Sequence, residues 1–483
     1  MTQPTDTVHR LFIGGEWVDG AGIADDINPS NLRDVVGRYA QADASHAAAA
    51  VQAAKAAAPG WAASTPQQRF DVLDFIGTEI LARREELGRL LAREEGKTLP
   101  ESVGEVARAG AIFKFFAGEA VRTAGEHIPS VRPGIEIDML REPLGVVGLI
   151  TPWNFPAAIP AWKTAPALAY GNSVVLKPAE LVPGSAWALA EIISRSGLPR
   201  GAFNLLLGKG RILGQALVGD PDVAGISFTG SVEVGTTLAA TLAGRLARVQ
   251  LEMGGKNPLV VLDDADLAVA VNAAVNGAYF STGQRCTASS RLIVTAGIEG
   301  KFVKAMTDRL AALKVDDAVA PGTDIGPVVD QAQLDKDLGY IAIGSREGGR
   351  LVFGGERLSK STEGYYLSPA LFTETTNGMR LNREEVFGPV AAVVRARDYE
   401  EALALANDTP FGLCAGICTT SLKYASHFRK HSQAGMVMVN LPTAGVDYHV
   451  PFGGKKGSSY GTREQGRYAL EFYTTVKTCY TAP

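Results

Sequence analysis

Short, almost uninterrupted runs of apolar residues that alternate with helical patterns constrain the fold of this chain more than any other feature. The clearest runs are Val146–Ile150 and Ser173–Lys177, and the residues between them, Ala161–Ala169, have a helical pattern. Two further runs follow at Phe203–Leu206 and Gly225–Thr229. Continuous apolar runs are typical of parallel strands that are buried on both faces. The alternation predicts a doubly wound α/β sheet, which binds ligands beyond the carboxyl ends of its strands.

A second alternation of the same kind starts after Glu252. Its predicted strands are Pro258–Leu262, Leu292–Val294 and Ala391–Val394, and a helical pattern follows each of them. We therefore expect two α/β domains that meet near Glu252. Ahead of the first alternation, the sequence predicts two short strands within residues 11–18 and long helices within residues 44–58, 66–95 and 103–120.

The segment Gly125–Arg141 differs from both alternations. It contains two prolines, and its polar and apolar residues alternate from Ile135 to Met139, a pattern that predicts an exposed hairpin. The C-terminal residues Thr474–Thr478 alternate like an edge strand, and we expect them to pair with this hairpin. Because an isolated hairpin is only marginally stable and exposes its edges, the pattern predicts an oligomerisation arm.

Composition excludes several classes of protein. The chain has 483 residues, of which 46% are hydrophobic and 20% are charged, and its net charge of −4 argues against a nucleic-acid partner. Four cysteines are too few for a disulfide framework, and the spaced pair Cys414 and Cys418 lacks the further ligands of a zinc site. The polar N-terminus, Met1–Arg10, and the lack of a run of roughly 18 apolar residues predict neither a signal peptide nor a membrane span. We therefore expect a cytoplasmic protein.

Cys286 stands in a polar, glycine-containing turn between a helical pattern and a predicted strand. Such a turn suits a nucleophilic cysteine, because the reactive form is the thiolate and a free thiol is mostly protonated at neutral pH. A neighbouring cation would favour the thiolate, and Arg285 and Arg291 supply positive charge close by in sequence, which does not fix their distance in space. The alternative is that Cys286 is a small buried side chain without chemistry.

Two other polar residues have the chemistry that a covalent intermediate on a cysteine requires. Asn154 follows a predicted strand, so its amide can donate a hydrogen bond to a developing oxyanion, although it also suits a turn between two prolines. Glu252 precedes two glycines that allow a close backbone approach, and it can act as a general base. Glu385 is a second candidate carboxylate, and the loop Pro451–Gly457 can close over a substrate.

Two segments have features of a dinucleotide site. Lys177 and Glu180 follow a predicted strand and can hydrogen-bond ribose hydroxyls, and the Glu180 carboxylate would repel a 2′-phosphate, which favours NAD over NADP. A solvated charge pair is the alternative. Gly230 and Ser231 join a strand to a helix, whose N-terminal N–H groups can receive a pyrophosphate.

Taken together, these motifs resemble those of one family. PWNFP, KPAE, FTGS, LEMGGKNP, GQRC, EEVFGP and PFGG occur in the order and approximate spacing of the aldehyde dehydrogenase superfamily. The resemblance implies an NAD-binding domain over residues 1–122 and 142–251, a catalytic domain over residues 252–440, and an oligomerisation element over residues 123–141 and 463–483. It also implies a homodimer or homotetramer.

By the same resemblance, Cys286 attacks an aldehyde, and Asn154 with the backbone N–H of Cys286 holds the oxyanion. After hydride transfer to the nicotinamide, Glu252 activates the water that hydrolyses the thioester. Glu385 would hold the nicotinamide ribose. The implied cofactor is NAD, with NADP as the alternative, and no metal is expected. The implied cofactor-binding residues are Trp153, Lys177, Glu180, Gly230, Ser231, Glu385 and Phe387.

Arg285 suggests an aldehyde that carries a carboxylate, since a guanidinium can bind a carboxylate in bidentate fashion. The alternative is that Arg285 faces solvent or tunes Cys286. Trp162 stands where succinate semialdehyde dehydrogenases typically have an arginine, which argues against succinate semialdehyde as the main substrate. We expect further substrate contacts from Phe155 and Phe452.

The segments Asn440–Gly454 and Tyr460–Tyr468 resemble those of α-ketoglutarate semialdehyde (2,5-dioxopentanoate) dehydrogenases. This resemblance implies oxidation of 2,5-dioxopentanoate to 2-oxoglutarate. One alternative is a dehydrogenase of broad specificity for succinate or glutarate semialdehyde. Another is a non-catalytic nucleotide-binding homologue, although the presence of Cys286, Glu252 and Asn154 together argues against it.

Overall fold

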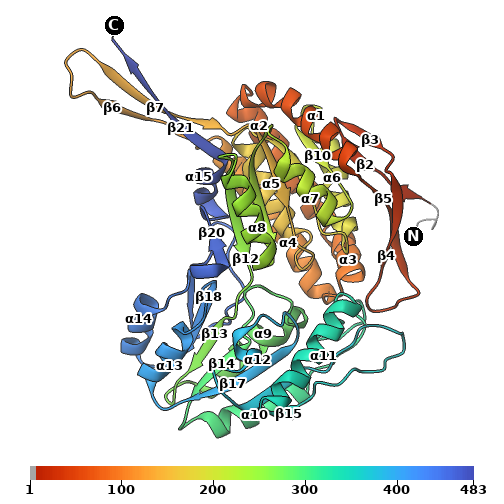
Figure 1. Ribbon diagram of the computed structural model, residues 1–483, viewed down its shortest axis with the longest axis vertical. Coiled ribbons are helices and arrows are strands. Elements are labelled where there is room, and N and C mark those ends of the chain that lie inside the picture. The colour runs from red at the N-terminus through yellow and green to blue at the C-terminus, as the bar shows by residue number, and fades with distance from the viewer. Residues whose placement is uncertain (1–6, 483) are drawn as a thin grey trace.

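The computed structural model describes residues 7–482, which fold around two large sheets with an arm projecting from one end (Figure 1). The predicted α/β class with two mostly parallel sheets and a β arm is confirmed. Part of the segment Met1–Arg10 lies outside the described residues. None of the helices within residues 7–482 is long and apolar enough to cross a membrane.

The first sheet has the order β20-β12-β11-β8-β9-β10-β2-β3. Its strands are β2 (Leu11–Ile13), β3 (Glu16–Val18), β8 (Val146–Ile150), β9 (Ser173–Lys177), β10 (Phe203–Leu205), β11 (Val223–Gly230), β12 (Arg248–Met253) and β20 (Ser459–Tyr460). The strands from β12 to β10 run parallel, and β2, β3 and β20 are antiparallel additions at the two edges. Every residue of β8 and β9 is buried, which explains their continuous apolar runs.

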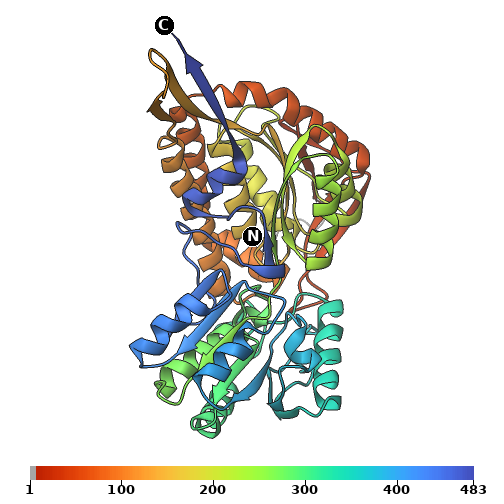
Figure 2. The same cartoon turned by 60° about the vertical axis from the view of Figure 1, so that its left-hand side comes forward.

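Helices cover both faces of this sheet (Figure 2). The helices form two groups. In one group α4 packs against both α2 and α5, and in the other α7 packs against both α1 and α8. The helices are α1 (Ala44–Ala62), α2 (Pro66–Ala82), α3 (Arg84–Glu95), α4 (Leu99–Ala120), α5 (Ala158–Ala169), α6 (Pro183–Ser194), α7 (Gly210–Gly219) and α8 (Val232–Ala243). The helical pattern expected over residues 66–95 is divided at Arg83, whose guanidinium bonds to Glu86 and Glu191.

The second sheet has the order β15-β16-β17-β14-β13-β18-β19, and all its strands except β15 run parallel. Its strands are β13 (Pro258–Val261), β14 (Arg291–Thr295), β15 (Arg350–Phe353), β16 (Ala370–Thr375), β17 (Val390–Ala396), β18 (Cys414–Cys418) and β19 (Met436–Val439). Its helices are α9 (Leu267–Tyr279), α10 (Glu299–Ala311), α11 (Gln331–Arg346), α12 (Arg380–Arg383), α13 (Tyr399–Asn407) and α14 (Leu422–His431). The chain passes from the first sheet to the second between Met253 and Pro258, while the boundaries of the three predicted domains stay a prediction.

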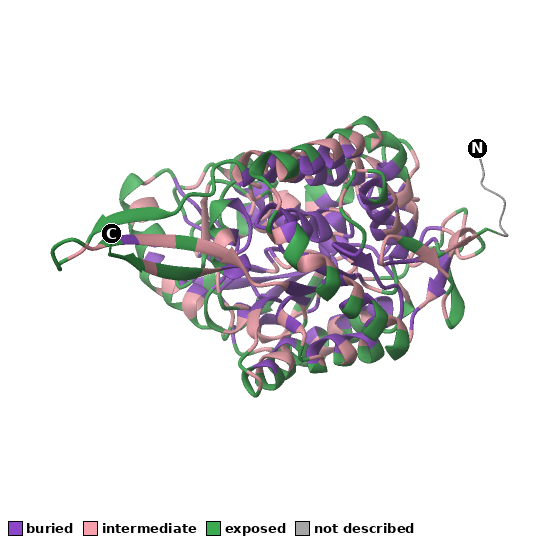
Figure 3. Ribbon diagram, turned by 90° about the horizontal axis from the view of Figure 1, so that it is seen from above, coloured by how far each residue is buried: buried purple, intermediate pink, exposed green. Residues whose placement is uncertain are grey.

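The arm is a three-stranded antiparallel sheet of β6 (Glu126–Pro129), β7 (Glu136–Pro143) and β21 (Thr474–Thr481). The short helix α15 (Leu470–Tyr473) directly precedes β21 in the chain. The predicted pairing of the C-terminal strand with the hairpin is confirmed, in a register that runs from Thr474 opposite Pro143 to Thr481 opposite Glu136. Most of the arm is exposed, whereas the buried residues gather in the body (Figure 3).

Several strands were not expected from the sequence. In the two large sheets they include β12, which carries Glu252 and lies beside β11, and also β15, β16, β19 and β20. A small sheet of β1 (Val8–His9), β5 (Val35–Gln41) and β4 (Gly22–Ile27) was not expected either, because its residues are too polar or too exposed for a clear apolar period.

Candidate active site

Cys286 lies on the wall of two neighbouring cavities. The first, which we call the arginine cavity, has a volume of about 290 Å³ and is lined by Arg108, Phe155, Trp162, Arg285, Cys286 and Phe452, among others. The second, which we call the Trp153 cavity, has a volume of about 200 Å³, and its lining includes Trp153, Asn154, Gly230, Ser231, Glu385, Phe387 and Cys286. All four predicted substrate residues therefore share one cavity, and most of the predicted cofactor residues share the other.

The loop that carries Cys286 is held in an unusual conformation. Ser281, Thr282 and Gly283 all have positive φ, between 51° and 66°. A Cβ on Gly283 would lie 2.2 Å from the carbonyl oxygen of Gly388, so only glycine fits there. Asn257 Nδ2 donates a 2.8 Å hydrogen bond to the Cys286 carbonyl oxygen, which fixes the backbone of the cysteine.

The Cys286 thiol is less acidic than expected. Burial is the main reason that its pKa rises to about 12, and the charges of Glu385 and Glu252 add to the rise. The backbone N–H groups of Cys286 and Thr287 act in the opposite direction. Of the two arginines that stand close to Cys286 in sequence, Arg291 is fully buried and donates to Asn377 and to main-chain carbonyls.

Asn154 follows β8 and is buried on the wall of the Trp153 cavity. Its Nδ2 donates to the main-chain carbonyl oxygen of Gln284 over 2.9 Å. The main-chain carbonyl oxygen of Asn154 accepts from Lys97 Nζ over 2.8 Å. A side-chain amide has two N–H groups, so one remains for a ligand. The predicted oxyanion donor thus shares a cavity wall with the predicted nucleophile.

Glu252 lies in β12 opposite Ser459 of β20, and Ser459 Oγ donates a 2.5 Å hydrogen bond to its carboxylate. Burial, followed by the charge of Glu464, raises the Glu252 pKa well above its usual range. Glu252 is not among the described residues that line either cavity. A Cβ on Gly453 would lie 2.6 Å from Glu252 Oε1, so the glycine of the PFGG motif is what allows this approach.

Glu385 fits against the two glycines of the LEMGGKNP motif. Its Oε1 accepts a 2.9 Å hydrogen bond from the Gly255 N–H, and a Cβ on Gly254 would lie 2.2 Å from its Oε2. Phe387 has a φ of 69°, and its ring meets Trp153 edge to face at 5.4 Å. Two motifs that are about 130 residues apart therefore form one wall of the Trp153 cavity.

The remaining cofactor residues lie at or just past the carboxyl ends of β9 and β11, the two strands that flank β8. Lys177 ends β9 and is buried, which lowers its pKa, while Glu180 three residues later is exposed. These two residues line neither cavity. Gly230 ends β11, and Ser231 caps helix α8 by accepting a hydrogen bond from the Val234 N–H. A helix N-terminus can donate to a pyrophosphate, and a lysine and a carboxylate can hydrogen-bond ribose hydroxyls, so these residue types fit a dinucleotide.

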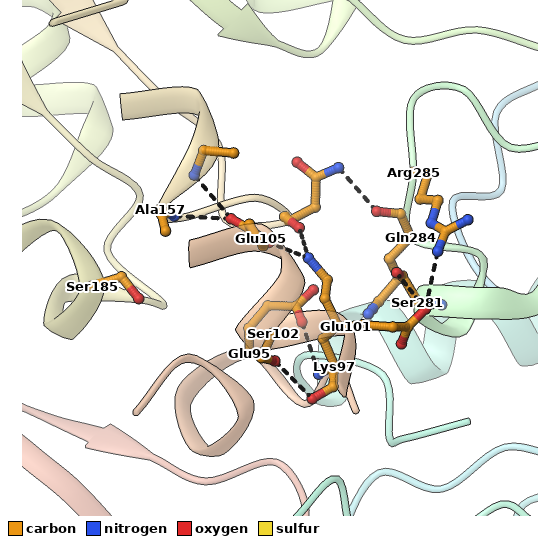
Figure 4. Close-up of polar contacts among 12 residues, drawn as sticks. Glu95, Lys97, Glu101, Ser102, Glu105, Ala157, Ser185, Ser281, Gln284 and Arg285 are labelled. Carbon is orange, nitrogen blue, oxygen red and sulfur yellow. Dashed lines mark hydrogen bonds and ion pairs between the residues drawn. The ribbon is translucent and has the colours of Figure 1, made fainter. Parts of the chain in front are cut away.

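The sequence reasoning missed the charged residues of α4 and of the turn before it. Lys97 Nζ and Glu105 Oε2 form a fully buried 2.6 Å ion pair, and Glu105 Oε1 also accepts from the N–H groups of Ala157 and Ala158 at the start of α5 (Figure 4). Arg108 lines the arginine cavity one turn further along α4. The available signal was the spacing of Glu101, Glu105 and Arg108 on one face of an otherwise largely apolar helix.

A partly buried thiol between two cavities, an amide donor on the wall of one of them and two carboxylates are groups that an enzyme forming a covalent adduct needs. The model of the aldehyde dehydrogenase family matches residues 17–479, and this chain belongs to that family. The resemblance inferred from the motifs is therefore confirmed, and an aldehyde dehydrogenase, not a non-catalytic homologue, is the class that the findings support.

Individual relatives differ in the substrate they are named for. The chain is 42% identical over 476 residues to the α-ketoglutaric semialdehyde dehydrogenase of Bacillus subtilis, covering 98% of each chain. It is 41% identical to a betaine aldehyde dehydrogenase of Cereibacter sphaeroides, covering 96% of each. A crystal structure of Staphylococcus aureus betaine aldehyde dehydrogenase in complex with NAD+ has a TM-score of 0.96 and 36% identity, covering 98% of this chain and 94% of that one.

Proposed function

We propose that this chain oxidises an aldehyde that carries a carboxylate, with NAD as the hydride acceptor and Cys286 as the nucleophile. The substrate that we propose is 2,5-dioxopentanoate, which would be oxidised to 2-oxoglutarate. The observation that carries the proposal is that Cys286 belongs both to a cavity lined by two arginines and to a cavity lined by the N-terminus of α8 and by Glu385. The name of the Bacillus subtilis relative supports the same substrate.

The first step is attack by the Cys286 Sγ on the aldehyde carbon, which forms a thiohemiacetal. The thiol must lose its proton for this step, and its raised pKa means that the thiolate is a minor form at neutral pH. The free N–H of the Asn154 amide and the backbone N–H of Cys286 donate to the oxyanion. Asn154 and Cys286 line the same cavity, which supports this assignment.

Bound NAD supplies the acceptor for the hydride of the thiohemiacetal carbon. In this proposal Glu385, Trp153 and Phe387 hold the nicotinamide end, because they line the cavity that Cys286 shares. Ser231 and the N-terminus of α8 receive the pyrophosphate, and Lys177 with Glu180 binds the adenosine ribose. The exposed Glu180 carboxylate would repel a 2′-phosphate, which supports NAD over NADP.

Hydrolysis of the resulting thioester requires a general base, and we assign this role to Glu252. Its carboxylate must leave Ser459 and turn toward Cys286 to take a proton from water. Since its pKa is raised, the fraction that is ionised increases with pH above the usual carboxylate range. Hydrolysis is therefore expected to accelerate as pH rises.

The test compares NADH formation with 2,5-dioxopentanoate, succinate semialdehyde, glutarate semialdehyde, pentanal and betaine aldehyde. We expect the highest kcat/KM with 2,5-dioxopentanoate and the lowest with betaine aldehyde, because two arginines disfavour a cationic substrate. A preference for betaine aldehyde would refute the anionic substrate. Equal kcat/KM with all three acids would favour the second candidate, a semialdehyde dehydrogenase of broad specificity. Positive charge on the cavity wall attracts a carboxylate but does not by itself distinguish substrates by the length of their carbon chain.

A Glu252→Gln variant tests the assignment of the base. We expect the rapid formation of one NADH per active site, after which the thioester is not hydrolysed and accumulates. The thioester is detected as the added mass of the acyl group on the peptide that contains Cys286. The matched control is Cys286→Ser at the same concentration, which should give no burst and no adduct. Continued turnover of Glu252→Gln at the wild-type rate would remove Glu252 from hydrolysis.

A further inference from the structure

We propose that Arg108, and not Arg285, provides the positive charge that binds the carboxylate of the substrate. This inference rests on the proposed anionic substrate and assigns the residue that recognises it. Both arginines line the arginine cavity together with Cys286. They differ in how much of their charge and how many of their N–H donors the protein itself already uses.

Arg285 is committed to other protein groups. Its Nη2 forms a 3.0 Å ion pair with Glu101 Oε1, and its Nη1 lies 3.3 Å from the carbonyl oxygen of Asn276 (Figure 4). The side chains of Arg285 and Glu101 are only 11% and 20% exposed, so solvent screens this pair weakly. Glu101 also accepts from the N–H and Oγ of Ser281, which ties the Arg285 pair to the loop that carries the nucleophile.

Arg108 is not neutralised in this way. Within residues 7–482 it forms no ion pair, and its one hydrogen bond runs from Nη2 to Gln465 Oε1, a neutral acceptor 3.0 Å away. Its Nε is buried and has no partner. The carboxylates whose charge reaches it are Glu105, which is already paired with Lys97, and Asp447. A guanidinium stays charged even when burial lowers its pKa, so a partly buried cation without a counter-ion faces this cavity.

The unsatisfied groups of the cavity wall are all donors. Among the described lining residues, the fully buried side-chain atoms without a hydrogen-bond partner are Arg108 Nε, Arg285 Nε and Trp162 Nε1. The Arg108 guanidinium lies 5.8 Å from the centre of the Trp162 ring, so the two groups occupy the same part of the wall. A wall with unpaired donors and no unpaired buried acceptor is complementary to an anion, and a carboxylate has two oxygens to offer it.

This assignment also gives a function to Trp162, which stands where succinate semialdehyde dehydrogenases typically have an arginine. Trp162 is buried, its ring lies 5.4 Å from that of Phe452, and it packs beside Arg108. In this arrangement Trp162 and Phe452 contact the carbon chain of the substrate, and Arg108 contacts its charged end. The cation needed for an acidic aldehyde comes from α4 instead of α5.

The experiment measures the ratio of kcat/KM for 2,5-dioxopentanoate to kcat/KM for pentanal in the wild type, Arg108→Met and Arg285→Met. Methionine keeps most of the apolar stem and removes the charge. We expect the ratio to fall about 100-fold in Arg108→Met, through KM, and less than about 5-fold in Arg285→Met. Arg108→Lys, which keeps the charge but loses the fork, should recover part of the ratio. A larger fall in Arg285→Met than in Arg108→Met would overturn the assignment.

A second measurement separates this assignment from the substrate itself. Glutarate, which has a carboxylate but no aldehyde, is tested as a competitive inhibitor of pentanal oxidation in the same variants. If the wild type does not prefer acids as substrates but glutarate inhibits it and not Arg108→Met, the proposed substrate fails and the Arg108 anion site stands. If acids are preferred, and neither this preference nor inhibition by glutarate changes in Arg108→Met, the substrate stands and the anion site is refuted. If neither acid preference nor inhibition by glutarate occurs, both proposals are refuted.

Discussion

At the scale of single residues, the chemistry of this site depends on a thiol that its surroundings keep protonated. Burial and two nearby carboxylates raise the Cys286 pKa to about 12, although the cysteine lies at the junction of two cavities. The protein therefore presents an accessible but weakly ionised nucleophile before its ligands bind.

This state predicts a specific pH dependence for alkylation. The rate of Cys286 modification by iodoacetamide should rise about tenfold per pH unit from pH 7 to 9 without a plateau, because only the thiolate reacts and the pKa lies above this range. Peptide mass spectrometry measures the rate, with Cys479, which is also partly buried, as an internal comparison. A plateau below pH 8 would show that the thiol is acidic.

The glycine at 254 gives a second prediction at this scale. In Gly254→Ala the new Cβ would lie within 2.4 Å of three Glu385 carboxyl atoms, so Glu385 must move away from the Gly255 N–H. We expect KM for NAD to rise about tenfold, the effect of losing one charge-assisted hydrogen bond. Gly300→Ala is the matched control, because a Cβ there meets nothing within 4 Å. Equal KM values in both variants would contradict the role of Glu385.

At the scale of elements, α4 and the turn before it connect three parts of the site. Lys97 pairs with Glu105 and also donates to the Asn154 carbonyl oxygen, Glu105 accepts from the first N–H groups of α5, and Glu101 holds Ser281 and Arg285. The buried pair of Lys97 and Glu105 thus positions Asn154. Helix α4, through Glu101, also supports the loop that carries Cys286.

Breaking this pair should destabilise the fold strongly. Lys97→Met leaves the Glu105 carboxylate buried and uncompensated, which is expected to lower the free energy of unfolding by about 3–5 kcal/mol. Lys55→Met is the control, because solvent screens the partly exposed Lys55 and Asp222 pair and its loss should lower the free energy of unfolding far less. Urea unfolding measures both variants. Similar losses in the two would mean that burial of the Lys97 pair does not govern its contribution.

At the scale of the whole molecule, the projecting arm is the feature that a single chain does not explain. The arm projects from the body (Figure 1), and its exposed large apolar residues include Val131, Leu140, Val476 and Tyr480. Exposed apolar side chains on a narrow sheet are a surface that another chain can cover. We therefore keep the prediction of a homodimer or homotetramer.

Light scattering after gel filtration tests this prediction. The wild type should have two or four times the mass of one chain, and Val476→Glu with Tyr480→Glu should reduce the mass, because charges on the arm disfavour its burial. Ile23→Glu, an exposed apolar residue of β4 away from the arm, should leave the mass unchanged. A monomeric wild type would refute the predicted assembly.

The sequence by itself determined the features that depend on local order. The apolar runs Val146–Ile150 and Val174–Leu176 specified β8 and the interior of β9, because a strand buried on both faces needs no polar side chain there. The motifs around Cys286, Asn154 and Glu385 specified the family, because each motif keeps its residues within a few positions of one another. The C-terminal strand was predicted to pair with the hairpin because both alternate along their length.

Only the tertiary structure decided how the charges are shared. Arg285 precedes the nucleophile and was the natural choice for the substrate carboxylate, yet Glu101, more than 180 residues earlier, pairs with it. Arg108, inconspicuous in its helix, lies in the same cavity without a counter-ion. Likewise, Glu252 proved to lie in a strand opposite Ser459, and burial raises its pKa. The physical reason is that burial, pairing and pKa depend on which distant segments meet, and a local pattern of residues does not contain that information.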